Sequence, residues 1–113
     1  MAKGSRSDIH DDNKILAINS PKDSIGGPYI VVHKNVTDEF WAIVALDWLG
    51  EPRLGMRWFY DRIGNPVSNF NPTWFIIPPS LTKTLLAGLA MDHQRKTKID
   101  DFLSGKIKGD KLL

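Results

Sequence analysis

The chain contains no cysteine among its 113 residues. This absence excludes disulfide bonds, thiolate nucleophiles and metal sites with cysteine ligands. A chain without disulfides is typical of a reducing compartment, and we expect a cytoplasmic protein. The sequence also lacks an apolar run of the roughly 18 residues needed to span a bilayer. Residues 1–13 contain no apolar stretch of the kind found in signal peptides, so we expect neither secretion nor membrane association.

The sequence has no large excess of either charge. Fifteen Lys and Arg residues stand against thirteen Asp and Glu residues, which gives a net charge of +2. This balance excludes the strongly basic composition of histone-like proteins. Any nucleic-acid binding would therefore depend on where individual cations lie rather than on the total charge.

Recognisable catalytic motifs are missing as well. The sequence contains no phosphate-binding loop, no nucleophile elbow and no zinc-protease helix motif. The segment "DIHDD" (residues 8–12) combines His10 with three aspartates, but a metal site needs ligands held in place by a folded segment. We therefore expect a non-enzymatic protein with no catalytic residues, metal ion or cofactor, and we infer no small-molecule substrate.

The distribution of apolar residues predicts one domain. Residues 1–12 are polar and show no periodicity, which favours a flexible N-terminal tail. Residues 13–105 contain the apolar patterns of a single α+β domain. Residues 106–113 are expected to form a frayed C-terminal end.

Local patterns predict the elements of this domain. Runs of apolar and β-branched residues favour strands over residues 13–19, 29–34, 40–48, 52–60 and 73–78. Leucines at helical spacing predict a helix over 80–90, and a second helix should follow an N-cap at Asp92. The expected fold is α+β: a curved antiparallel sheet of four to five strands, followed by one or two C-terminal helices packed on one face.

The runs 40–48 and 52–60 flank a short connection that contains glycine, which predicts an antiparallel hairpin. The simplest register pairs residues whose numbers sum to 100. It predicts an apolar face, which should pack on the helices, with these members: Phe40, Ala42, Val44, Leu46, Leu54, Met56, Trp58 and Tyr60. The opposite, mixed face would carry Trp41, Ile43, Asp47, Arg53, Arg57 and Phe59, with Asp47 directly across from Arg53.

The mixed face offers the residue types that bind single-stranded nucleic acid. Bases stack on exposed aromatic rings such as Trp41 and Phe59, while Arg53 and Arg57 could contact phosphates. Alternatively, the two aromatic rings could cover the second side of the sheet beneath the N-terminal segment, or lie in a dimer contact, with Arg57 extended over them. The basic run "HQRKTK" (93–98) could also meet phosphates or form a solvated helix face.

The order of these motifs resembles the single-stranded-DNA-binding domain of the positive cofactor four family of transcriptional coactivators and the related Whirly proteins. The matching motifs, within residues 40–90, are "LGMRWFY" (54–60) with Arg57, "GNP" (64–66), "TWFII" (73–77) and "PPSLTKTLLAGL" (78–89). The family's Lys-Gly pair falls on Thr73-Trp74 here, and its acidic residue falls on Trp58. The resemblance implies an antiparallel sheet followed by a helix, single-stranded DNA binding and dimerisation.

Together, these patterns predict a non-enzymatic single-stranded nucleic-acid-binding protein, such as a transcription or replication accessory factor. The binding residues would be Trp41, Arg53, Arg57 and Phe59. The alternative is a protein–protein interaction module of the same fold with no affinity for nucleic acid. A homodimer is expected because the second helix carries an apolar stripe, Ile99, Phe102 and Leu103, beyond what a small sheet would cover.

Overall fold

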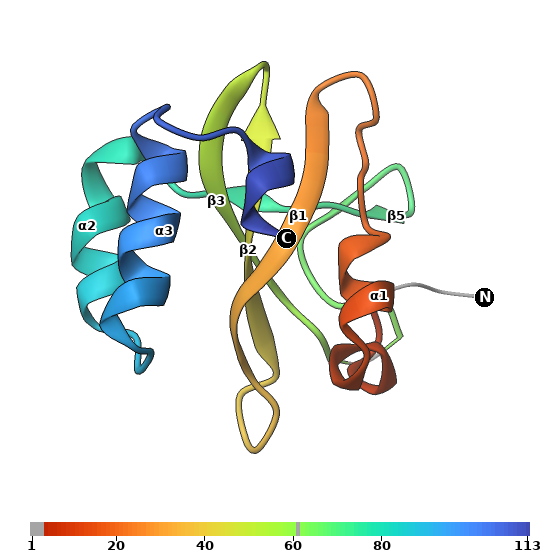
Figure 1. The fold of residues 1–113 in the computed structure, drawn as a ribbon. Coiled ribbons are helices and arrows are strands. Elements are labelled where there is room, and N and C mark those ends of the chain that lie inside the picture. The colour runs from red at the N-terminus through yellow and green to blue at the C-terminus, as the bar shows by residue number, and fades with distance from the viewer. Residues whose placement is uncertain (1–3, 61) are drawn as a thin grey trace.

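A four-stranded antiparallel sheet forms the centre of the fold, with strand order β1-β2-β3-β6 (Figure 1). The computed structural model describes residues 4–60 and 62–113; residues 1–3 of the predicted tail lie outside the described residues. In chain order the elements are η1 (Arg6–His10), α1 (Asp12–Leu16), β1 (Ile25–Asn35), β2 (Trp41–Trp48), β3 (Glu51–Trp58), β4 (Val67–Ser68), β5 (Asn71–Pro72), β6 (Phe75–Ile76), α2 (Pro79–Ala87), α3 (His93–Leu103) and η2 (Gly109–Leu112).

The predicted α+β class is confirmed. Helices α2 and α3 lie on one side of the sheet, and α1 lies on the other (Figure 1). Pro79 occupies the first position of α2, where its missing N–H costs nothing. Asp92 caps α3, as predicted, and its carboxylate accepts a hydrogen bond of 2.8 Å from the Arg95 backbone N–H. Within the described residues, none of the helices combines the length and apolarity needed to cross a bilayer.

Both predicted chain ends are folded where the structure describes them. Residues 13–19 were predicted as a strand, but residues 12–16 form α1, which Asp11 caps by accepting a hydrogen bond from the Asn13 N–H. The prediction of a flexible tail is wrong from Gly4 onward, because Ile9 is fully buried. The C-terminal end is not frayed either, since η2 places Leu112 in the core. Single buried residues such as Ile9 and Leu112 form no periodic apolar pattern, so no signal in the sequence indicates that these segments fold.

The β2–β3 hairpin forms, but the predicted register is wrong by one residue. Paired residues sum to 99 rather than 100, so that Trp41 faces Trp58 and Trp48 faces Glu51. The connection is a two-residue turn, Leu49-Gly50, in which both φ angles are positive. This geometry matches the twist of the strands, whereas the usual sequence signal for it is Asn-Gly or Asp-Gly. The leucine therefore concealed the turn.

The shift in register changes the partners on each face of the sheet. The alternation along β3 is as predicted, with Leu54 on the helix side and Arg57 on the other. The β2 side chains lie on the faces opposite to those predicted, because the odd-numbered residues of β2 share a face with Leu54. The helix-side core contains Ile43, Ala45, Leu54, Leu86, Ile99 and Phe102. The opposite core contains Ile9, Ile15, Ile18, Ala42, Val44, Leu46, Phe59 and Trp74.

Each face of the sheet therefore carries a core that the chain itself builds. The N-terminal segment packs over the face that was predicted to meet solvent or a partner. The apolar stripe of α3 is also internal, since Ile99 and Phe102 are buried in the helix-side core. Of this stripe only Leu103 is partly exposed, and the homodimer stays a prediction.

Candidate functional site

Two of the four predicted binding residues, Arg57 and Phe59, lie in the core. The Phe59 side chain is 0% exposed and the Arg57 side chain 1% exposed, with the guanidinium 4.8 Å from the centre of the Phe59 ring. Solvent-exposed stacking of a base on Phe59 is therefore impossible in this fold. The cause is the N-terminal segment, which packs over the face of the sheet that carries both side chains.

The Arg57 guanidinium is occupied by four backbone carbonyls. Its Nε donates to Thr73 O at 2.9 Å, and its Nη2 donates to Ile63 O at 2.8 Å and to Pro66 O at 3.3 Å. Its Nη1 donates to Gly4 O at 3.4 Å. Arg57 thereby joins the N-terminal segment to the connection between β3 and β6, which is a structural task.

The electrostatic setting of Arg57 agrees with this arrangement. Burial lowers the pKa of Arg57 to about 10, and the nearby Asp8 carboxylate acts in the opposite direction. The guanidinium therefore keeps its charge at neutral pH, so its hydrogen bonds are charge-assisted. Asp8 itself accepts a hydrogen bond of 2.8 Å from the Gly4 N–H.

The other two predicted residues are half-buried and lie on different faces. Trp41 is on the helix side, where its indole Nε1 donates to Glu39 Oε1 at 3.0 Å and its ring lies 5.6 Å from that of His33. Arg53 pairs with Leu46 on the other side, and its Nη1 donates to Pro52 O at 2.7 Å. The four predicted residues therefore do not form one exposed platform.

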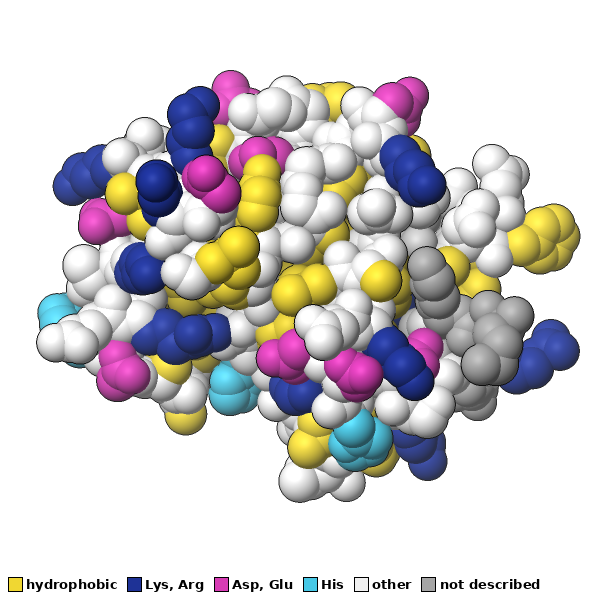
Figure 2. Space-filling model, turned by 45° about the vertical axis from the view of Figure 1, so that its right-hand side comes forward, with side chains coloured by type: hydrophobic (Ala, Val, Ile, Leu, Met, Phe, Trp, Pro, Cys, Tyr) yellow, Lys and Arg dark blue, Asp and Glu magenta, His cyan; other side chains and the backbone are white. Residues whose placement is uncertain are grey.

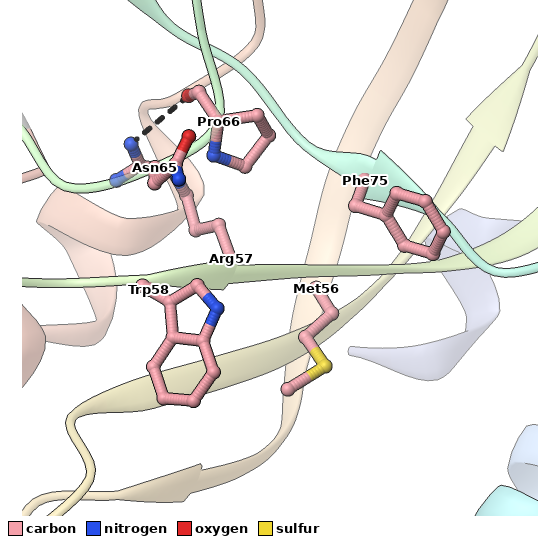
Figure 3. Close-up of a pocket in the computed structure, with 6 residues that line it drawn as sticks. All are labelled: Met56, Arg57, Trp58, Asn65, Pro66 and Phe75. Carbon is pink, nitrogen blue, oxygen red and sulfur yellow. Dashed lines mark hydrogen bonds between the residues drawn. The ribbon is translucent and has the colours of Figure 1, made fainter.

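A different aromatic surface is exposed where β3 meets the edge strand β6. We call Met56, Trp58 and Phe75 the aromatic cleft, because they line a cavity of about 240 Å³ together with Arg57, Asn65 and Pro66. Trp58 is 38% exposed and Phe75 is 58% exposed. Figure 3 shows Met56 and Trp58 projecting from the same side of β3, with Arg57 turned toward Pro66.

Local backbone geometry holds the walls of the cleft. The pairing of Met56 with Phe75 brings β6 against β3. Trp58 exchanges two backbone hydrogen bonds with Asn65, of 2.8 and 3.1 Å, which folds the following loop back over the strand end. Gly64 makes this return possible: its φ is +72°, and a Cβ there would lie 2.1 Å from Trp58 O.

The charges around the aromatic cleft are sparse. Among its six lining residues only Arg57 is charged, and the four carbonyls already occupy its donors. On the face shown in Figure 2, Lys and Arg side chains are interspersed with Asp and Glu and form no continuous basic track. In the described part of the chain, no three His, Cys, Asp or Glu side chains gather as a metal site would require.

Comparison with protein-family models, curated proteins and solved structures gives no match. The resemblance to the positive cofactor four family stays a prediction. The aromatic cleft was not predicted, because Trp58, on the same face as Met56, was expected to be buried beneath the helices, whereas it is 38% exposed. The only signal in the sequence was the position of Trp58 at the end of its strand, beyond the leucines of the helix-side core.

Proposed function

We propose that the chain is a non-enzymatic protein-interaction module whose aromatic cleft binds an apolar side chain of a protein partner. The observation that carries this proposal is the pair of exposed rings, Trp58 and Phe75, on either side of a cavity of about 240 Å³. Large aromatic residues and methionine are enriched in the buried centres of protein interfaces.

The energetics favour a partner that fills the cleft. Trp58 and Phe75 retain contact area that an inserted apolar side chain would remove from water, at roughly 25 cal/mol per Å². A tryptophan in such a position commonly contributes about 2 kcal/mol or more to an interface.

Single-stranded nucleic acid is the competing occupant. Bases could stack on the same two rings, since stacking needs only an exposed aromatic face. Nucleic-acid affinity, however, depends strongly on phosphate contacts with free Lys and Arg. The cleft supplies no such cation from its own lining, which is why a protein partner is favoured.

The test is a peptide-display selection against the intact chain, with the double variant Trp58→Ala/Phe75→Ala as counter-target. Selected peptides should share one large apolar residue and should bind the wild type with a change in tryptophan fluorescence. Each cleft substitution should weaken binding about tenfold or more while lowering stability by about 1 kcal/mol or less. Phe70→Ala is the matched control, because Phe70 is 91% exposed and does not line the cleft.

An unstructured DNA oligonucleotide provides the second arm. If it binds through the same two rings and its affinity falls steeply as salt rises, the cleft is a nucleic-acid platform and the protein-partner proposal fails. The proposal also fails if selected peptides bind the double variant as well as they bind the wild type.

A further inference from the structure

A second cavity lies at the other end of the hairpin, next to the β2–β3 turn. It has a volume of about 450 Å³ and is bounded by strand residues on one side and by the segment after α3 on the other. Figure 1 shows this segment crossing the sheet to η2, which lies beside β1. The volume is in the range of small-molecule sites. No residue of the aromatic cleft lines it.

A short hydrogen bond between Tyr29 and Asp47 forms one wall of this cavity. The Tyr29 Oη donates to Asp47 Oδ2 at 2.6 Å. Burial, followed by the bond to Asp47, raises the pKa of Tyr29 to about 12. Tyr29 is therefore the proton donor at neutral pH, and the Asp47 carboxylate is the acceptor.

The negative charge in this cavity lacks a paired cation. Asp47 is half-buried, and among the described residues its carboxylate has the Tyr29 hydroxyl as its one hydrogen-bond donor and forms no ion pair. Asp110 also lines the cavity without an ion pair in that part of the chain. Lys108 is the single cation in the lining. A partly desolvated carboxylate gains most from a cation that can approach it directly.

Apolar side chains form the remaining walls. Pro52, Phe102 and Ile107 line the cavity, and the Phe102 ring packs edge-on against Tyr29, with centroids 5.9 Å apart. These groups suit the carbon skeleton of a ligand. The cavity thus combines the Asp47 carboxylate with apolar walls.

We propose that this cavity binds a small organic cation, an ammonium or guanidinium group on a short apolar body, with Asp47 as its anionic anchor. The cation would share the Asp47 carboxylate with Tyr29, whose hydroxyl holds that carboxylate in place. Asp110 would add a second, more exposed negative charge. The body of the ligand would lie against Pro52 and Ile107.

The structure supplies its own reporters for a binding experiment. Gly50, Gly105 and Gly109 line the cavity, and their backbone amide signals can be followed by ¹H–¹⁵N NMR during a titration. Gly88, at the end of α2, does not line it and serves as the internal control. The probes are benzylamine and benzylguanidine, with benzyl alcohol and benzoate as neutral and anionic counterparts of similar shape.

Either cationic probe, added to about 10 mM, should shift the three cavity glycines along a saturating curve and leave Gly88 in place. Benzyl alcohol and benzoate should give no saturating shift. Asp47→Asn should weaken binding about tenfold or more, because it removes the charge but keeps an oxygen that Tyr29 can bond. Asp23→Asn removes an exposed charge elsewhere and should have no effect.

Two results would overturn the proposal with the wild-type protein alone. One is a failure of both cations to produce saturable shifts at the cavity glycines, and the other is an equal response to benzyl alcohol. If Asp47→Asn does not fold, the more exposed Asp110→Asn should still weaken binding measurably. Unchanged binding in a folded Asp47→Asn variant would also refute the role of Asp47.

Discussion

Replacing Arg57 with methionine should destabilise the fold strongly. Methionine replaces the unbranched aliphatic stem of arginine, but it lacks the guanidinium group and has no hydrogen-bond donor. The substitution therefore leaves four backbone carbonyls without the guanidinium that now binds them. A buried acceptor that loses its donor carries the full cost of its desolvation.

The expected magnitude follows from the lengths of the four bonds. The bonds to Thr73 and Ile63, at 2.9 and 2.8 Å, are short, and those to Gly4 and Pro66, at 3.4 and 3.3 Å, are weaker. Hydrogen bonds to a charged group contribute about 1.5–3 kcal/mol each, so the two short bonds dominate. Removing the buried charge returns part of this energy. We expect a net loss of about 3 kcal/mol in the free energy of unfolding.

Urea unfolding followed by tryptophan fluorescence measures this loss. The transition midpoint should fall while its slope stays unchanged, and the melting temperature should drop by roughly 10–15 °C. Arg62→Ala is the matched control: Arg62 is exposed, so this variant should stay within about 0.5 kcal/mol of the wild type.

The same variant separates the structural role of Arg57 from its originally predicted role. If Arg57→Met costs less than about 1 kcal/mol, the carbonyls do not depend on the guanidinium and the structural reasoning is refuted. If that stable variant also loses affinity for a DNA oligonucleotide, Arg57 would be the nucleic-acid contact that the sequence predicted.

Three further predictions concern the hairpin turn and the wall of the second cavity. Leu49→Asn should stabilise the fold by about 0.5–1 kcal/mol in urea unfolding. Leu49 is 67% exposed and has a φ of +52°, which asparagine adopts more readily than leucine, and Asn-Gly suits this turn. If the substitution gives no gain in stability, the turn assignment is contradicted. The pKa of Tyr29 is higher in the folded state, so its contribution to stability is present below pH 10 and is lost as pH rises toward 12. An ultraviolet titration of the tyrosine phenolates should show a component near pH 12 that Tyr29→Phe removes. If this component persists in Tyr29→Phe, the assignment is refuted. Gly109→Ala should lower the free energy of unfolding by about 1–3 kcal/mol in thermal unfolding, since the added Cβ would lie 2.0 Å from the Tyr29 ring. Gly88→Ala, whose Cβ would make only ordinary van der Waals contacts, should cost under about 0.5 kcal/mol. Equal effects of the two substitutions would contradict the packing of Gly109 against Tyr29.

Several features of the fold could be predicted because they depend on neighbours in the sequence. The two strands of the hairpin follow from runs of β-branched and aromatic residues, and both occur close to the expected positions. The proline before α2 and the capping aspartate before α3 are local signals, and both helices begin beside them. The alternation along β3 also holds, since it depends only on the pleat of one strand.

The candidate site could not be predicted, because it depends on which distant segments cover each face of the sheet and on how two strands align. A shift of one residue moves a whole set of side chains to the other face. The turn at Leu49-Gly50 caused that shift, and it exchanged Ile43 for Ala42 beside Arg57. Arg57 is a buried donor because the N-terminal segment and the β3–β6 connection supply the carbonyls around it, while Trp58 at the end of β3 stays 38% exposed.

The sequence by itself determined the α+β class, the order of the hairpin and the two C-terminal helices, because periodicity and capping act over a few residues. Only the tertiary structure decided which aromatic rings meet solvent. The N-terminal isoleucines, which are distant from β3 in the sequence, cover the face that carries Phe59. No local sequence pattern predicts this contact. Exposure is a property of packing between separate segments, and the position of the aromatic cleft and of the second cavity follows from that packing.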